Sequence, residues 1–213
     1  MTIKGVNMSN ISSSETIDSL AKALFARDPY TALHCRNVQN YARKVALKLK
    51  LSAPEIQNIE IGALLHDIGK IGTPENILLK PGKLSDEEFQ SIMMHPTQGY
   101  DIISGIHELC IRGIDKSILH HHERFDGTGY PSRLKGEDIP LAARIISVCD
   151  AFDAMTTSRS YSPALSPEKA LDQLRSNAGT QFDVMVVNAF IDCYQNRTIE
   201  IDPVMLKKIS MTS

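Results

Sequence analysis

The chain has 213 residues and a formal net charge of −2, with 42% hydrophobic and 23% charged residues. This length supports a core large enough to enclose a buried site. A chain without a basic block is a poor candidate for general DNA or RNA binding, and its apolar stretches are far shorter than the ~18 residues of a membrane-spanning helix. The four cysteines form no Cys-x-x-Cys pair, which excludes a zinc ribbon and indicates reduced thiols in a cytoplasmic protein.

Helix signals begin near the N-terminus and recur along the chain. The serine–glutamate spacing of a capping box occurs at three places, Ser12 with Glu15, Ser52 with Glu55, and Ser85 with Glu88. Apolar residues at spacings of three and four follow, which indicates amphipathic helices. We expect Gly69 to end the helix that begins at Ser52, in a left-handed cap.

Loops and further helices are predicted beyond these segments. Glycine and proline concentrate in residues 69–84 and 126–140, which predicts two loops. Pro140 suits the first turn of a helix through Ala154, and Ser166 with Pro167 marks another helix start. A last helix is expected over about 183–194. No convincing two-residue alternation of a strand occurs, so the predicted fold is all-α, a single-domain helical bundle.

Histidines and carboxylates carry the chemical signal. His66 and Asp67 are adjacent at the inner end of a predicted helix, within ALLHDIGKIG. A buried imidazole beside a buried carboxylate needs a partner for its charge, and a divalent metal supplies one. Asp150 interrupts an otherwise apolar helix, where a carboxylate is costly unless it binds a metal or pairs with a cation. His34 alone is typical of a core histidine.

A second histidine group precedes a glycine-rich loop. His121 and His122 stand before Glu123, and residues 126–131 read DGTGYP. Adjacent residues on a helix point about 100° apart, so both histidines reach one metal cluster only if it lies across the inner edge of the helix. An exposed polar helix end is the alternative interpretation.

Four segments together resemble the motifs of the HD-GYP family, bacterial phosphodiesterases of cyclic dinucleotides in the HD metal-phosphohydrolase superfamily. They read ALLHDIGKIGTPENILLKPGKL, MMHPTQG, HHERFDGTGYP and IPLAARIISVCDAFDAMTTSRSY, in the family's order. The resemblance covers roughly residues 28–190. It implies a helical bundle with a metal site in its core, with residues 15–213 as the catalytic domain and residues 1–14 poorly ordered.

The resemblance implies a centre of two divalent ions bridged by Asp67. The other ligands implied are His34, His66 and Asp150 for the first ion, and His95, His121 and His122 for the second. Imidazole and carboxylate donors suit iron or manganese, with zinc or nickel as alternatives. His107 and His120 match no ligand of the family. Some members carry a glutamate where this chain has Tyr30, and that glutamate helps to bind a third metal, so we expect two ions.

The same resemblance implies how the reaction proceeds. A hydroxide bridging the two cations attacks phosphorus in line, with Asp67 and Lys70 as catalytic residues. Lys70 and Arg159 are expected to bind phosphate. Gly129 and Tyr130 are expected to bind substrate, although a pure folding role for their loop is an equal alternative.

Three acidic residues outside the ligand set receive supporting roles. Glu123 and Asp126 are expected to orient ligands or to hold the glycine-rich loop. Asp153 is expected to act in the same way, with an exposed or capping carboxylate as its alternative.

The predicted function is therefore hydrolysis of cyclic di-GMP to linear pGpG, GMP or both. Cyclic GMP-AMP is the alternative substrate. A mononuclear nucleotidase, a di-iron oxygenase and a non-catalytic cyclic dinucleotide-binding module are the other classes considered. The metal, the end product and the oligomeric state stay open, with a homodimer or a signalling-protein partner as alternatives. Few residues precede the motifs, so either a stand-alone enzyme or a fragment is expected.

Overall fold

The computed structural model describes residues 13–27, 29–80, 82–157 and 164–200. Within these ranges the protein is helical, and its only β interaction is an isolated bridge between Ala178 and Phe182. The predicted all-α fold is confirmed. None of the described helices is both long enough and apolar enough to cross a membrane. Ser12, and most of the segment 1–14 expected to be poorly ordered, lie outside the described residues.

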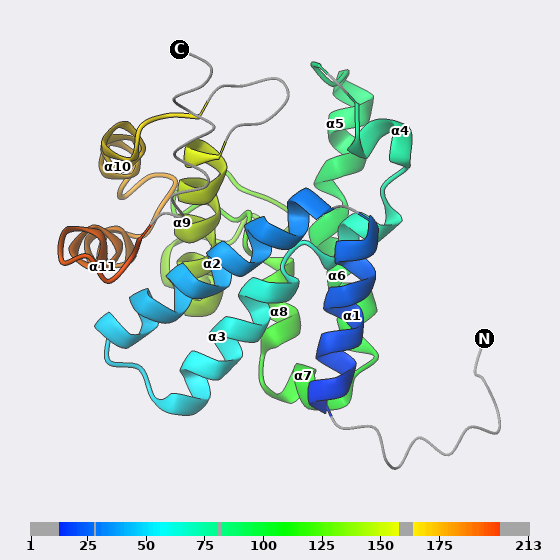
Figure 1. Ribbon diagram of the computed structural model, residues 1–213, viewed down its shortest axis with the longest axis horizontal. Coiled ribbons are helices and arrows are strands. Elements are labelled where there is room, and N and C mark those ends of the chain that lie inside the picture. Colours follow the sequence, from blue (N-terminus) through cyan, green and yellow to red (C-terminus); the bar gives the residue numbers. More distant parts are fainter. Residues whose placement is uncertain (1–12, 28, 81, 158–163, 201–213) are drawn as a thin grey trace.

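The first part of the chain supplies the long helices. They are α1 (Ser13–Arg27), α2 (Pro29–Lys48) and α3 (Ala53–Leu65), followed by the 3-10 helix η1 (Ile68–Gly72), α4 (Glu75–Leu78) and α5 (Asp86–Met93). Figure 1 shows α2 beside α3 and in front of α9, with α4 and α5 projecting away from the rest of the bundle. Neither α4 nor α5 contains a buried residue, so this projection contributes nothing to the core.

The second part surrounds those helices. It comprises α6 (His95–Ser104), α7 (His107–Ile111), α8 (Ile114–Leu119), the 3-10 helix η2 (Gly136–Asp138), α9 (Leu141–Thr156), α10 (Pro167–Ser176) and α11 (Val184–Gln195). The helices predicted from Pro140 and near 183 begin within a residue of those positions. In Figure 1, α10 and α11 lie side by side at one edge, next to α9.

The core consists of two clusters of buried apolar side chains that meet along α2. One cluster joins α2 to α9 and α11, where the Phe152 and Phe190 ring centroids lie 4.7 Å apart and Tyr41 contacts both rings. The other joins α1, α3, η1 and α6–α8, and it includes Cys35 and Leu65. Val38 and Cys35 belong to different clusters although both are on α2. The predicted metal ligands lie on, or directly after, helices that contribute to these two clusters.

Helix starts follow the predicted capping signals. The Ser52 N–H donates to the Glu55 carboxylate at 2.8 Å, and the Ser85 N–H donates to Glu88 at 2.7 Å. The Ser166 hydroxyl accepts a hydrogen bond at the start of α10. These bonds satisfy N–H or hydroxyl groups that would otherwise lack partners at a helix end. The capping boxes at Ser52 and Ser85 and the cap at Ser166 are therefore confirmed.

The predicted role of Gly69 is wrong. Helix α3 ends at Leu65, and its C-cap residue His66 is right-handed, with φ −54°. Gly69 lies inside η1, where an added Cβ would stand 1.9 Å from the backbone oxygen of His95. Glycine is required because η1 passes directly against the start of α6, and not because the chain turns left-handed.

The two predicted loops are also less simple than expected. Residues 69–84 contain most of η1 and the single turn of α4, and residues 126–140 contain η2. Short turns of this kind lack the extended amphipathic pattern on which sequence-based recognition of helices depends.

Candidate metal centre

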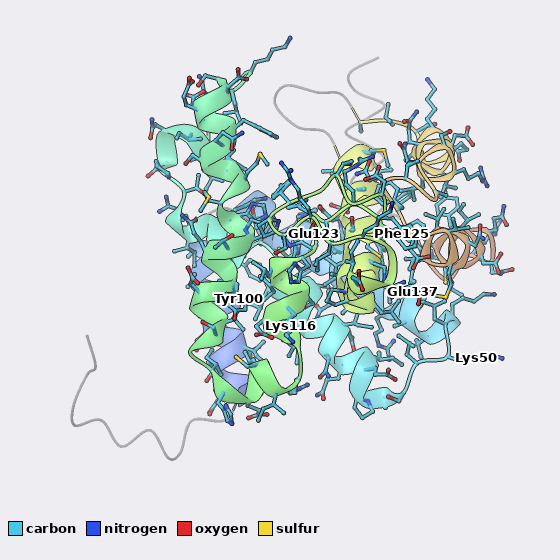
Figure 2. The ribbon with its side chains drawn as sticks, turned by 180° about the vertical axis from the view of Figure 1, so that it is seen from behind. Lys50, Tyr100, Lys116, Glu123, Phe125 and Glu137 are labelled. Atoms are coloured by element: carbon cyan, nitrogen blue, oxygen red, sulfur yellow. The ribbon has the colours of Figure 1, made fainter. Side chains whose placement is uncertain are left out.

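Five segments of the bundle bring the predicted ligands to one place. His34 lies on α2, His66 and Asp67 follow the end of α3, and His95 is the first residue of α6. His121 and His122 follow α8, and Asp150 lies on α9. Figure 2 shows Glu123, the residue after this histidine pair, near the middle of the molecule beyond the helix that carries Lys116.

His121 and His122 lie beyond the end of helix α8 and not within it. Helix α8 stops at Leu119, and residues 120–122 form a turn. The constraint expected for two adjacent histidines on a helix therefore does not apply. The turn places the His121 and His122 rings at a centroid distance of 4.1 Å, so both reach the same position.

The first group of ligand atoms belongs to His34, His66 and Asp150. These atoms lie within 4.8 Å of one another, and His34 Nε2 stands 3.1 Å from Asp150 Oδ1. Asp67 Oδ2 lies 3.6 Å from His66 Nε2 and 3.9 Å from His34 Nε2. This spacing leaves room for one ion among four donor side chains.

The second group belongs to His95, His121 and His122, whose ligand atoms also lie within 4.8 Å of one another. His95 Nε2 is 3.2 Å from His121 Nε2 and 3.4 Å from Asp67 Oδ1. Asp67 thus turns one carboxylate oxygen toward each group. The structure brings together all seven side chains predicted as ligands, in the division that the resemblance implies.

Hydrogen bonds on the far side of the rings orient four of the histidines. The Nδ1–H groups of His66, His95 and His121 each donate to the backbone carbonyl three residues earlier, at 2.8, 2.8 and 2.6 Å. His34 Nδ1 donates to Asp153 Oδ2 at 2.7 Å. A carbonyl or carboxylate only accepts, so Nδ1 carries a hydrogen and Nε2 is the ring atom that faces the centre.

The donor set fits a metal ion. His66 is 1% exposed, and its Nε2 has no hydrogen-bond partner among the described residues. Leaving such a buried acceptor unsatisfied costs about 1–3 kcal/mol, which coordination would remove. Burial lowers the pKa of His95 and of His122 to about 3, so both rings are neutral, as a metal ligand must be.

The carboxylates of the centre are held ionised. Burial alone would raise the pKa of Asp67, but Lys70 and the histidines around it bring that pKa well below its usual value. Burial also acts to raise the pKa of Asp150, but the hydrogen bond with His34 and the charges of the surrounding histidines together bring that pKa well below its usual value. Burial lowers the pKa of His34, whereas Asp150 and Asp153 raise it to about 9. A metal at this position would therefore displace a proton from His34.

Cys35 lies beside the first group but does not resemble a ligand. Its sulfur is within 4.8 Å of donor atoms of His66 and Asp67. Burial, followed by the charge of Asp67, raises the pKa of the Cys35 thiol well above its usual value. A protonated thiol is a poor ligand, so the centre keeps its imidazole and carboxylate character.

Of the two cationic side chains predicted to bind phosphate, Lys70 lies among the described residues and Arg159 does not. Lys70 Nζ donates to Asp67 Oδ2 at 2.6 Å, which places a positive charge at the edge of the centre. Arg159 lies outside the described residues. Tyr30 belongs to α2, one turn before His34, and its side chain also lies outside the described part.

The glycine-rich loop packs against the second group. An added Cβ at Gly129 would stand 2.3 Å from the backbone nitrogen of Arg124, so only glycine fits this approach. The Tyr130 ring stacks on His122, with centroids 5.0 Å apart and an interplanar angle of 23°. Tyr130, predicted to bind substrate, is thus placed directly on a predicted metal ligand.

Glu123 and Asp126 hold this loop in shape. The buried Glu123 carboxylate accepts from the Ser132 N–H at 2.6 Å. Asp126 accepts from the Thr128 N–H at 2.9 Å and from Arg124 at 3.1 Å. The structure favours the loop-holding role over the ligand-orienting role for both residues.

The two histidines without an assigned role lie outside both groups. His120 Nδ1 stands 3.6 Å from Glu123, and His107 is exposed at the start of α7.

One residue of the centre's surroundings was missed by sequence reasoning. The Asn37 side-chain amide donates to Asp153 Oδ1 at 2.8 Å, on the side of Asp153 that faces away from His34. Its only sequence signal is its position, three residues after His34 and therefore on a neighbouring part of the same helix surface.

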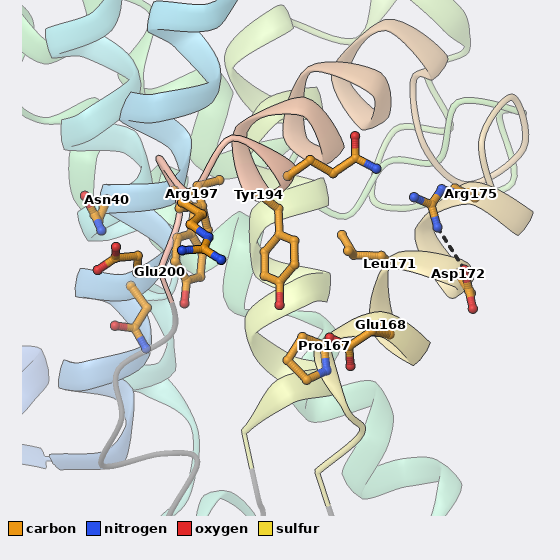
Figure 3. Close-up of a pocket in the computed structure, with 13 residues that line it drawn as sticks. Asn40, Pro167, Glu168, Leu171, Asp172, Arg175, Tyr194, Arg197 and Glu200 are labelled. Carbon is orange, nitrogen blue, oxygen red and sulfur yellow. Dashed lines mark hydrogen bonds and ion pairs between the residues drawn. The ribbon is translucent and has the colours of Figure 1, made fainter.

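A cavity of about 930 Å³ lies away from the two ligand groups, between α2, α10 and the end of α11. Figure 3 shows Asn40, Arg197 and Glu200 on one side, Leu171 and Asp172 on the other, and Tyr194 between them. Asn37 also lines this cavity.

Comparison with known proteins places most of the chain in one family. A family model described as the HD domain matches residues 17–186. The chain is 42% identical over 177 residues to the "Cyclic di-GMP phosphodiesterase response regulator RpfG" of Xanthomonas campestris, covering 83% of this chain and 47% of that protein. It is 33% identical over 180 residues to the "3'3'-cGAMP-specific phosphodiesterase 2" of Vibrio cholerae, covering 84% of this chain and 34% of that protein. The chain therefore spans less than half the length of these curated relatives.

Solved structures show the same fold. The crystal structure of the V. cholerae cyclic GMP-AMP specific phosphodiesterase V-cGAP3 superposes with a TM-score of 0.68 at 21% identity, over 91% of this chain and 52% of that chain. The HDG"Y"P protein Bd1817 from Bdellovibrio bacteriovorus superposes with a TM-score of 0.63 at 21% identity, over 85% of this chain and 63% of that chain. At this identity the likeness concerns the fold.

Proposed function

The chain belongs to the HD domain family, in the HD-GYP branch that its motifs and relatives indicate, and from this premise we propose that residues 15–213 form a catalytic domain that hydrolyses cyclic di-GMP. The products would be linear pGpG, GMP or both. The observation that carries the proposal is Asp67, whose two carboxylate oxygens each face one group of buried histidine nitrogens.

The centre is proposed to hold two divalent ions, with iron or manganese preferred by its nitrogen and oxygen donors and zinc or nickel as alternatives. His34, His66 and Asp150 would hold the first ion, His95, His121 and His122 the second, and Asp67 would bridge them. When bound, such a pair lowers the pKa of water and neutralises charge on a phosphodiester. Tyr30 supports two ions rather than three, because a phenol offers one weakly acidic oxygen where glutamate offers two.

The chain's own residues would then position the substrate. Lys70 holds its ammonium at the edge of the centre, within 2.6 Å of Asp67, where it would attract a phosphate oxygen. Arg159 is proposed to bind phosphate through its planar guanidinium. Gly129 and Tyr130 would form the wall of the substrate site next to His122, with Tyr130 packed on that ring.

Cyclic GMP-AMP is the second candidate substrate. Its support is the name of three V. cholerae relatives, which are 33–35% identical to this chain and are called 3'3'-cGAMP-specific phosphodiesterases. Cyclic di-GMP is preferred because relatives named for it reach 38–42% identity. We place the reaction in the cytoplasm, since both cyclic dinucleotides act as bacterial second messengers and the cysteines are free thiols.

The test is a product analysis with metal-assayed protein that has been purified anaerobically. Cyclic di-GMP, cyclic GMP-AMP and cyclic di-AMP are incubated separately, and the products are identified by chromatography and mass spectrometry. His107→Ala is the matched control, because His107 is exposed and lies outside both ligand groups. Turnover of cyclic di-GMP by wild type and by this control supports the proposal. Binding of a cyclic dinucleotide by fully metal-loaded protein without turnover would identify a binding module instead.

A further inference from the structure

Asp153 is a buried carboxylate with two described side-chain partners, His34 and Asn37. It lies on α9 and is 1% exposed. Its Oδ2 accepts from His34 Nδ1 at 2.7 Å and its Oδ1 accepts from Asn37 Nδ2 at 2.8 Å. Among the described residues, no lysine or arginine forms an ion pair with it. The position of Asp153 therefore depends on these two hydrogen bonds.

The direction of the Asn37 amide follows from its partner. A carboxylate only accepts hydrogen bonds, so the NH₂ group of Asn37 must face Asp153. One helical turn of α2 separates Asn37 from His34, and both side chains reach the same carboxylate on α9. Asn37 holds one oxygen of Asp153, and this leaves the other oxygen directed at the His34 ring.

The geometry points to a positioning role for Asn37. We propose that Asn37 orients His34 through Asp153 and so supports the first metal position; this inference rests on the proposed metal centre. Its amide fixes the carboxylate, the carboxylate keeps the hydrogen on His34 Nδ1, and His34 Nε2 thereby faces Asp150 and Asp67. Asn37 touches neither donor group itself.

Packing alone does not account for this residue. Asn37 is half-buried and borders the cavity shown in Figure 3, in contrast to Val38 beside it, which is fully buried in the core. Truncation of Asn37 removes little core contact but leaves Asp153 Oδ1 without its donor. A carboxylate with one free oxygen can rotate, and His34 then loses its fixed partner. Loss of a partner of this kind typically lowers metal affinity by about 10–100-fold.

The test compares Asn37→Ala with Asn40→Ala in the full chain. Asn40 lines the same cavity one turn further along α2 and is exposed, so it controls for changes to that surface. Metal-free protein is titrated with Mn²⁺, and the thermal midpoint of the metal-free form is recorded. We expect Asn37→Ala to weaken one of the two Mn²⁺ affinities by about 10–100-fold. Asn40→Ala should bind as wild type. Both variants should keep a cooperative thermal transition, with a lower midpoint for Asn37→Ala because the buried Asp153 Oδ1 has lost its donor.

A double-mutant cycle distinguishes action through Asp153 from a separate effect. Asp153→Asn keeps the shape of the side chain and removes its charge. We expect Asn37→Ala to weaken Mn²⁺ binding much less in the Asp153→Asn background than in wild type, because the two residues act in series.

Three results would overturn the proposal. They are wild-type Mn²⁺ affinity in Asn37→Ala, equal losses in both backgrounds, and a wild-type protein that binds no Mn²⁺. Failure of the proposed function looks different, because a protein that binds two Mn²⁺ ions without cleaving any cyclic dinucleotide would leave this positioning role intact.

Discussion

The two groups of candidate metal ligands are built by different means. In the first group, carboxylates surround His34, and although burial lowers its pKa, Asp150 and Asp153 raise it to about 9. In the second group, three imidazoles lie together, and burial lowers the pKa of His95 and of His122 to about 3. The first half is an ionic network and the second a cluster of neutral rings held by backbone carbonyls and by Tyr130. Asp67 is the one side chain that both halves share.

Removal of that shared residue should have the largest effect. In Asp67→Ala, both ion positions lose a donor, so we expect turnover to fall below detection and metal content to drop. Metal analysis and a product assay with cyclic di-GMP check this, with His107→Ala as the control. Wild-type turnover with unchanged metal content in Asp67→Ala would contradict a bridged centre.

A smaller effect is expected where a residue contributes charge without holding a metal. Lys70→Ala should lower kcat/KM by about 10–100-fold, the equivalent of one hydrogen bond to a charged group of about 1.5–3 kcal/mol. Metal content should stay at the wild-type level. Lys116→Ala serves as the control, because Lys116 is an exposed lysine on α8. Loss of metal in Lys70→Ala would show that its contact with Asp67 is structural.

The neutral half depends on a ring contact, which two Tyr130 variants can isolate. Tyr130→Phe keeps the stack on His122, and we expect its Mn²⁺ affinities to match wild type. Tyr130→Ala removes the stack and should weaken one affinity by about 2–10-fold, since aromatic pairs contribute about 0.5–1.5 kcal/mol. Titration of metal-free protein with Mn²⁺ measures both variants. Equal weakening in the two variants would instead assign the effect to the hydroxyl.

The two halves should also differ in the sign of their pH dependence. His95 and His122 have a pKa lowered to about 3 in the folded state, so the unfolded chain binds more protons between pH 3 and 6.5. Metal-free protein should therefore lose stability as the pH falls through that window. His34, with its pKa raised to about 9, contributes stability below pH 6.5 that is lost as the pH rises through 9.

Denaturant titrations of chelator-treated protein across this pH range test the two signs separately. His34→Gln should flatten the alkaline side of the stability profile, and His95→Gln should flatten the acidic side. A profile in which either variant changes the opposite side would contradict the division of the centre into an ionic and a neutral half.

Local sequence determined the helix starts and marked His66, Asp67 and Asp150 as chemically unusual, whereas the full set of candidate ligands came from the resemblance of four motifs to a known family. The serine–glutamate pairs at Ser52 and Ser85 mark helix starts because the bonds that they form are between residues three apart. The motif around His66 and Asp67 is recognisable because imidazole and carboxylate beside each other in an apolar segment require a charged partner. These signals need no knowledge of the rest of the fold.

Tertiary structure decided what depends on contacts between distant segments. Gly69 looked like a helix terminator, but its actual reason is the approach of η1 to His95, 26 residues later in the sequence. Tyr130 packs on His122, and Asn37 reaches Asp153, 116 residues away. Glycine, tyrosine and asparagine have many uses, so their local sequence does not indicate which one applies. The residue types for a two-part centre are encoded along the chain, whereas their orientation is set by the packing of α2, α8 and α9 against one another.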